Sequence, residues 1–87
     1  MQNLGMQHLG RFIVRDEATC HGQPIFMGTR ILVADVLEQV AQGMAWPSII
    51  EEWRGAVSHE AIAEAVSLAR ASLISPVPEL LPQKLAA

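Results

Sequence analysis

The residues best suited to metal binding or nucleophilic chemistry are Cys20 and His21, which include the single cysteine of the chain. Together with His8 or His59 they could suggest a metal site. Adjacent Cys and His side chains cannot easily bind one ion with good geometry, and no second spaced pair follows. A nucleophilic role for Cys20 is equally weak, because the sequence places no base beside it. We expect no metal site, no catalytic residue and no cofactor.

Paired carboxylates are the second candidate for chemistry. They occur at Glu51-Glu52 and at Glu60 with Glu64. Both pairs fall on the outer faces of predicted helices, and no pocket-forming pattern accompanies them. A solvated surface is the simpler interpretation, so we expect the protein not to be an enzyme.

The stretch from Gly22 to Val33 is the hinge between strand-like and helical parts of the chain. Gly28 suits a backbone position with positive φ, and the spacing is not that of a phosphate-binding loop. Thr29 and Arg30 could form a partner-binding or nucleic-acid-binding loop. The alternative is a structural turn, in which a carboxylate such as Asp35 or a backbone carbonyl holds Arg30. We favour the structural turn.

Size and composition predict one small domain with apolar surface left over for a second chain. The chain has 87 residues, of which 51% are hydrophobic and 17% charged. A domain of this length buries only about 60–65% of the surface that its unfolded chain exposes. It therefore cannot hide so much apolar surface alone, and we expect a homodimer or a dedicated protein partner.

Charge and cysteine content limit the classes of function and location. The net charge is −3, and six basic residues are scattered along the chain. Nucleic-acid binding usually needs basic residues clustered on one face, so strong DNA binding by a monomer is not favoured. One cysteine excludes an internal disulfide, and no segment has the pattern of a signal peptide or a transmembrane helix. These features predict a cytoplasmic protein with no membrane association.

The order of the elements predicts a short β-ribbon followed by helices. We divide the chain into a flexible lead-in over residues 1–10, one domain over residues 11–74 and a Pro-containing tail over residues 75–87. Two strand-like runs, Arg11–Arg15 and Pro24–Met27, can pair as an antiparallel ribbon. Pro24 suits the start or the edge of a strand, because it cannot donate a ladder hydrogen bond.

Three helices are predicted over residues 31–44, 45–53 and 58–73. Gly43 closes the first helix, and Ser58 caps the third. Trp46 and Trp53 share one face of the second helix, as core residues or, if exposed, as interface anchors. The inner face of the third helix is predicted to contain Ile62, Ala65, Val66, Ala69 and Leu73.

The second and third predicted helices have the proportions of a helix-turn-helix. If the third helix entered a DNA groove, its outward N-terminal side chains would be His59, Glu60, Ala63 and Glu64. Two carboxylates repel phosphates, and none of the four is an Arg, Asn or Gln that reads a base edge. A three-helix bundle used for protein contact is therefore favoured.

A longer pattern through these elements resembles a known family. It runs Gly22-x-Pro24-Ile25-x-x-Gly28-Thr29-Arg30-Ile31-x-Val33, then Gly43, Ile49-Ile50 and Ala65-x-x-x-Ala69. Over about residues 12–73 the chain resembles the domain-of-unknown-function family numbered 433. The Gly-Thr-Arg-Ile-x-Val core with its upstream Gly-x-Pro is the specific part. The Tyr-Pro that is usual in the family before the third helix is replaced here by Trp53-Arg54-Gly55.

The resemblance implies a small, mainly α protein: a three-helix, homeodomain-like helix-turn-helix bundle with an N-terminal β-ribbon. Many family members are regarded as antitoxins of bacterial toxin–antitoxin pairs, with partners that resemble PIN-type ribonucleases. The resemblance thus implies an antitoxin that neutralises such a toxin, and the alternative is a small dimeric DNA-binding transcriptional regulator. The expected partners are a second copy, the toxin and, in the alternative, operator DNA.

The residues singled out by these interpretations fall into two groups. The candidates for binding a partner or DNA are Thr29, Arg30, Trp46, Trp53, Arg54 and His59, and the structural motif consists of Gly22, Pro24, Gly28 and Gly43.

Overall fold

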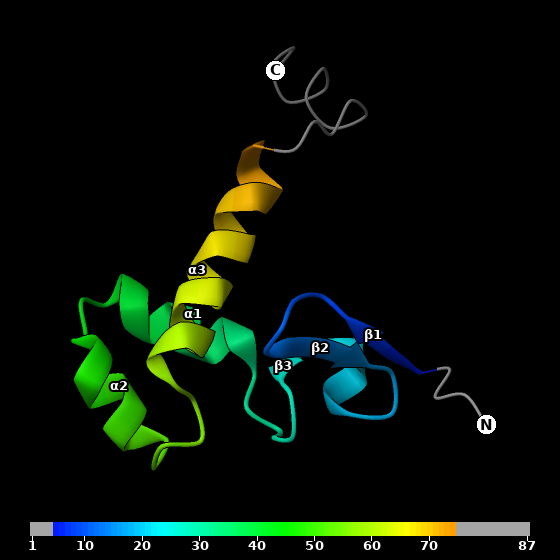
Figure 1. Ribbon diagram of the computed structural model, residues 1–87, viewed down its shortest axis with the longest axis horizontal. Helices are drawn as coiled ribbons and strands as arrows, with labels where there is room; N and C mark the ends of the chain where they lie inside the picture. The colour runs from blue at the N-terminus through cyan, green and yellow to red at the C-terminus, as the bar shows by residue number, and fades with distance from the viewer. Residues whose placement is uncertain (1–4, 75–87) are drawn as a thin grey trace.

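The chain folds into a small antiparallel sheet followed by three helices (Figure 1). The computed structural model describes residues 5–74, so the predicted tail over residues 75–87 lies outside the described residues. In chain order the elements are β1 (Met6–His8), β2 (Ile13–Asp16), the 3₁₀ turn η1 (Cys20–Gly22), β3 (Pro24–Phe26), α1 (Val33–Ala41), α2 (Trp46–Glu52) and α3 (His59–Ile74). The prediction of three helices behind an N-terminal antiparallel β element is confirmed.

The sheet has three strands where the sequence predicted a two-stranded ribbon, with β2 in the middle. β2 and β3 pair as expected, with Ile13 opposite Phe26. The third strand, β1, comes from the segment predicted as a lead-in and places Gln7 opposite Arg15. Its sequence, Met-Gln-His, contains no β-branched or Phe, Tyr or Trp side chain, so strand propensity could not identify it. Pairing with the buried central strand determines its conformation.

The central strand is buried on both faces of the sheet. Ile13 and Phe26 belong to the core that the helices share, whereas Val14 and Ile25 are equally buried but pair on the other face. The turn η1 packs against β2. The sheet is thus held between the helices and its own connecting turn.

The turn η1 has an unusual left-handed backbone. Cys20, His21 and Gly22 have φ values of 53°, 58° and 79°, a region that only glycine adopts freely. Two hydrogen bonds close the turn, from the Gly22 amide to the Thr19 carbonyl and from the Gln23 amide to the Cys20 carbonyl, each 3.1 Å long. Cys20 and His21 are therefore held in a strained conformation by the surrounding structure.

We expect His21→Gly to raise the free energy of unfolding by about 0.5–1 kcal/mol, because the left-handed strain that it removes exceeds the added entropy of glycine in the unfolded chain. The side chain of His21 is exposed, so little packing is lost. Urea denaturation measures the change. Gln23→Gly is the matched control, since Gln23 has an ordinary φ of −76° and can only lose stability. Equal losses in both variants would contradict the expectation.

The first helix ends as predicted, with Gly43 just beyond it. Gly43 has φ +85° and donates its amide proton to the Val40 carbonyl at 3.0 Å. The Met44 amide donates to the Gln39 carbonyl at 3.1 Å, which completes the hydrogen bonds of the helix end. Asp35 lies in the first turn, where a carboxylate is favourable. The helix is shorter at both ends than the predicted span of residues 31–44.

The connection from α2 to α3 is also defined by the backbone. Arg54 and Gly55 both have positive φ, and the Gly55 amide donates to the Ile50 carbonyl at 2.9 Å. The hydroxyl of Ser58 accepts a hydrogen bond from the Ala61 amide at 3.1 Å, which confirms Ser58 as the N-cap of α3.

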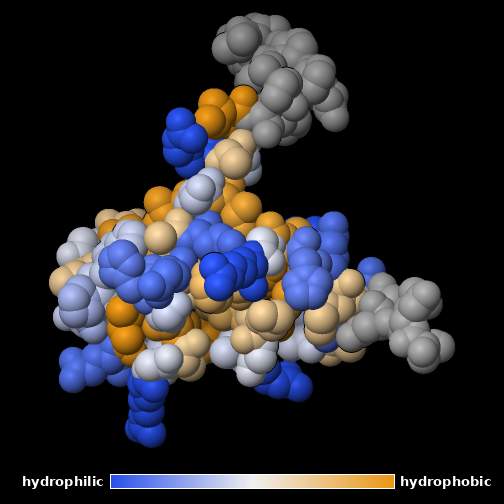
Figure 2. Space-filling model, viewed as in Figure 1, coloured by the Kyte–Doolittle hydropathy of each residue, from blue (hydrophilic) through white to orange (hydrophobic). Residues whose placement is uncertain are grey.

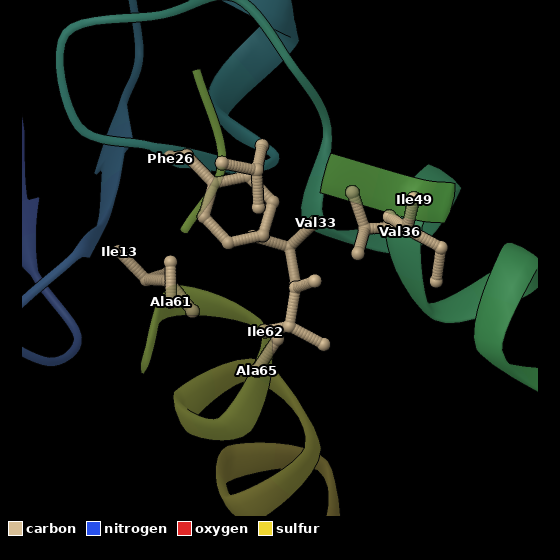
Figure 3. Close-up of a cluster of buried hydrophobic side chains, with 9 residues drawn as sticks. Ile13, Phe26, Val33, Val36, Ile49, Ala61, Ile62 and Ala65 are labelled. Atoms are coloured by element: carbon tan, nitrogen blue, oxygen red, sulfur yellow. The ribbon is translucent and has the colours of Figure 1, made fainter. Parts of the chain in front are cut away.

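The helices meet the sheet around one core of buried hydrophobic side chains (Figure 3). Phe26 from β3, Ile49 from α2 and Ile62 from α3 are each no more than 2% exposed. The predicted inner face of α3 is confirmed for Ile62 and Ala65, but it is wrong for Leu73, which is 88% exposed. Its position continues the periodicity of the helix, but α3 projects beyond the other elements (Figure 1). Leu73 therefore has little within residues 5–74 to pack against.

The surface mixes hydrophilic and hydrophobic side chains, and hydrophobic ones are visible at the projecting end of α3 (Figure 2). Within residues 5–74, no helix combines the length and the apolar character that a membrane span requires.

Candidate functional site

The turn between β3 and α1 is built around Thr29. Its hydroxyl donates to the Phe26 carbonyl at 2.7 Å and accepts from the Ile31 amide at 2.9 Å. Gly28 before it has φ +80°. Arg30 is exposed, so it needs neither Asp35 nor a buried carbonyl as a partner. Thr29 is thus structural, whereas the side chain of Arg30 is available for binding.

A small hollow lies beside this turn, with a volume of about 110 Å³. It is lined by Phe12, Phe26, Met27, Gly55, Ala56, Ser58 and Ala61. We call it the Met27 hollow, because Met27 contributes a large apolar side chain that is 48% exposed. The turn before α1 and the turn before α3 reach the same edge of the molecule, the lower edge in Figure 1. The fold thus joins three segments that are distant in sequence.

Three of the six basic residues belong to the segments that form the Met27 hollow. The guanidinium carbon of Arg11 lies 5.3 Å from the ring centroid of Phe12, within the range of a cation–π contact. Arg54 directly precedes Gly55, and Arg30 follows Met27 by three residues. All three arginines are exposed. The hollow can therefore offer a partner an apolar contact, with the guanidinium group of Arg11 next to its Phe12 wall.

The aromatic candidates Trp46, Trp53 and His59 do not line the hollow and have contacts of their own. The rings of Trp46 and His59 are 4.9 Å apart between centroids and tilted by 51°. The indole nitrogen of Trp53 donates to the side-chain oxygen of Gln39 at 2.7 Å. Both tryptophans are half-buried against the core, which agrees with their interpretation as core or core-edge residues.

The prediction that the side chain of Glu64 points outward, into a DNA groove or into solvent, is wrong. Its two carboxylate oxygens accept hydrogen bonds from the backbone amides of Arg11 and Phe12, both at 2.7 Å. A Cβ added to Gly10 would lie 2.5 Å from the carboxylate carbon of Glu64. We call this contact between α3 and the turn after β1 the Glu64 clamp. It holds the wall of the Met27 hollow that Phe12 supplies.

Cys20, first considered for metal or nucleophilic chemistry, lies near the backbone just before α1. Cys20 is half-buried, and its sulfur lies 3.7 Å from the Arg30 carbonyl. Among residues 5–74, no three or more His, Cys, Asp or Glu side chains are grouped so that they could hold a metal ion.

Sequence reasoning missed most of the Met27 hollow. It singled out Arg30 and Arg54 but not Arg11, Phe12 or Met27. An exposed methionine directly before a turn glycine is a signal that could have pointed to Met27. That Phe12 and the turn before α3 line the same hollow could not be predicted, because it depends on how the sheet docks on α3.

Comparison with known proteins identifies the family. The chain matches, over residues 13–70, the family model described as a protein of unknown function (DUF433). Searches of curated proteins and of solved structures gave no match. The matched region runs from β2 into α3 and includes the Thr29 turn, Met27 and the α2–α3 connection. The resemblance found in the sequence is thereby confirmed: the chain belongs to the DUF433 family of proteins of unknown function.

Proposed function

We propose that this protein binds another protein through the Met27 hollow, and that the partner is a PIN-like ribonuclease toxin which it neutralises as an antitoxin. The observation that carries the proposal is the hollow itself, which is lined by the exposed Met27, while the exposed Arg11 and Arg54 directly precede the lining residues Phe12 and Gly55. Met and Arg are enriched at protein interfaces, where an apolar anchor is surrounded by polar contacts.

The size of the hollow favours a protein side chain as its occupant. A volume of about 110 Å³ is well below the roughly 300–1,000 Å³ of a small-molecule pocket. It suits one apolar side chain of a partner, with acidic groups around that side chain to meet the arginines.

The charges around the hollow favour a protein surface over a phosphate backbone. Glu51 and Glu52 end α2 just before Arg54, and all three residues are exposed. Binding along a phosphate backbone needs a continuous stripe of basic residues, and these two carboxylates break up any such stripe. A protein partner can match mixed charges, because its own surface carries both signs.

The antitoxin role comes from the family resemblance, in which partners resemble PIN-type ribonucleases. Co-expression with the product of the neighbouring open reading frame tests this role. We expect that product to inhibit growth when it is expressed alone, and to copurify with this protein in a non-toxic complex. A neighbouring product that is harmless, or that does not copurify, would refute the antitoxin role.

The alternative function is a helix-turn-helix regulator that binds operator DNA with α3. Two contacts count against it: His59 lies against Trp46, and Glu64 is bound to the turn after β1. Both oxygens of Glu64 are therefore occupied, and the ring of the exposed His59 lies against Trp46. A mobility shift with upstream DNA at low salt tests this alternative, and a specific complex would favour it over protein binding.

We expect Arg30→Glu to weaken partner binding at least tenfold, because it places a negative charge beside a surface that should meet acidic groups. The variant should remain folded, since Arg30 is exposed and the Thr29 hydrogen bonds hold the turn. Isothermal titration with the copurified partner measures affinity, and circular dichroism checks folding. Arg70→Glu on α3 is the matched control, with the same charge change at an exposed arginine nine residues beyond Ala61, the last residue in sequence that lines the hollow. Equal losses in both variants would indicate a general charge effect and contradict the proposed site.

A further inference from the structure

A second and larger depression lies along α3, away from the Met27 hollow. Its volume is about 360 Å³. It is lined by Leu9, Ile13, Pro24, Val33, Leu37, Ala65, Leu68, Ala69 and Ser72. We call it the α3 groove. None of its lining residues carries a formal charge, so it suits an apolar occupant.

The projecting end of α3 carries an exposed apolar side chain, Leu73, of the kind that fits the α3 groove. Leu73 is 88% exposed and lies four residues after Ala69, which places both on the same side of the helix. The helix thus carries an apolar groove beside its middle turns and an uncovered leucine at its end. An exposed leucine beside an open apolar groove is the kind of surface that a protein partner covers.

We propose that a second copy of this chain covers both features, with the two α3 helices packed antiparallel across a twofold axis close to Ala69. Ala65 and Leu73 lie four residues before and after Ala69, so each is about 6 Å from it along the helix. A twofold axis at Ala69 therefore places Leu73 of each copy opposite Ala65 of the other copy. Each Leu73 then enters the groove of the opposite copy.

Self-complementarity favours a second copy over a different protein. One helix supplies both the groove and the leucine, and a twofold interface pairs each feature with the other twice. A different partner would have to supply both a matching anchor and a matching pocket at the same spacing. The twofold contact also closes on itself, so it gives a dimer and not a filament.

The charge distribution on α3 is compatible with this contact. A twofold axis brings the residue on the axis close to its own copy, so a charged residue there would face a like charge. Ala69 is uncharged and small, which lets the two helix backbones approach. Arg70, the nearest charged residue, is exposed, and it lies outside the groove lining.

This inference goes beyond the proposed function and does not depend on it. The α3 groove and the Met27 hollow share no lining residue. A dimer formed through α3 therefore leaves the Met27 hollow of each copy open to a toxin. The two proposals can be tested separately. Arg30→Glu should weaken toxin binding and leave the mass of the dimer unchanged.

Sedimentation equilibrium on the full chain tests the dimer. A monomer has a mass of 9.5 kDa, so the wild-type dimer should have twice that mass. Leu73→Glu should raise the dimer dissociation constant about 100-fold or more, because the charge enters an apolar contact twice. Ile74→Glu is the matched control: Ile74 is 59% exposed but turned about 100° further around the helix, so it should leave the mass unchanged.

Three results would overturn the proposal. The first is a wild-type chain that remains monomeric at about 100 µM, a concentration at which even a weak dimer would form. The second is a dimer that Leu73→Glu leaves intact, since the contact would then use another surface. The third is equal dissociation by Leu73→Glu and Ile74→Glu. Circular dichroism must show that both variants fold, as expected for exposed positions.

Cysteine cross-linking tests the position of the axis. In a Cys20→Ser background, Ala69→Cys should form a disulfide-linked dimer under mild oxidation, because the two positions meet at the axis. Ser67→Cys is the control, since Ser67 is exposed and lies outside the groove lining. Faster cross-linking at position 67 than at position 69 would contradict the proposed geometry.

Discussion

Replacing Ile62 by alanine should lower the free energy of unfolding by about 2–5 kcal/mol, because it removes methyl groups from a filled core and leaves a cavity. Ile62 is 0% exposed and lies where α3 meets the rest of the core (Figure 3). A domain of this size has only about 4–10 kcal/mol in total. Urea denaturation followed by circular dichroism should therefore show an unfolding midpoint at a much lower urea concentration than in the wild type.

Two variants test whether the effect of Ile62→Ala comes from burial. Ile62→Val removes one methylene and should lose about 0.5–1.5 kcal/mol. Ile74→Ala lies on the same helix but at a position that is 59% exposed, so it should change stability little. Equal losses for Ile62→Ala and Ile74→Ala would contradict the described core.

The second large effect is expected at the Glu64 clamp. Glu64→Ala should lower the free energy of unfolding by about 1.5–3 kcal/mol, because two backbone amides lose a charged acceptor. The amide of Arg11 is exposed, so water can replace the carboxylate there, whereas the amide of Phe12 is partly buried. If water reaches both amides, the loss should fall in the lower part of this range. Urea denaturation measures the loss.

A double-mutant cycle with Gly10 isolates the clamp. Gly10→Ala alone should be destabilising, because its Cβ would lie 2.6 and 2.7 Å from the two carboxylate oxygens of Glu64. When Glu64 is already alanine, that overlap disappears and Gly10→Ala should cost much less. We expect an interaction energy of about 1 kcal/mol or more between the two positions. Additive losses would show that Gly10 and Glu64 do not meet.

The helices could be predicted because their signals are local. Apolar periodicity located α1, and Gly43 and Ser58 marked helix ends through bonds to residues only three or four positions away. The strand β1 could not be predicted, because it depends on pairing with β2. Leu73 was assigned to the inner face because periodicity tells which residues share a side, but not where the packed neighbours end.

The candidate site was predictable only in part, for the same physical reason. Arg30 stood out as a charged residue between apolar runs, and its exposure could not be read from that pattern. Glu64 looked like a surface carboxylate, because its partners are backbone amides that any sequence offers. The Met27 hollow joins segments around positions 12, 27 and 55, and no local pattern relates them.

The Glu64 clamp also has a consequence for the order in which the chain folds. It joins residues that are 52 and 53 positions apart, whereas the contacts within and between α1, α2 and α3 link much closer positions. Closing a longer loop costs more chain entropy, so the helical part can form before the N-terminal sheet is fixed to it. In a newly synthesised chain the turn at Arg11 and Phe12 would then stay unanchored until α3 has left the ribosome, since the carboxylate that receives its amides lies on the last helix described.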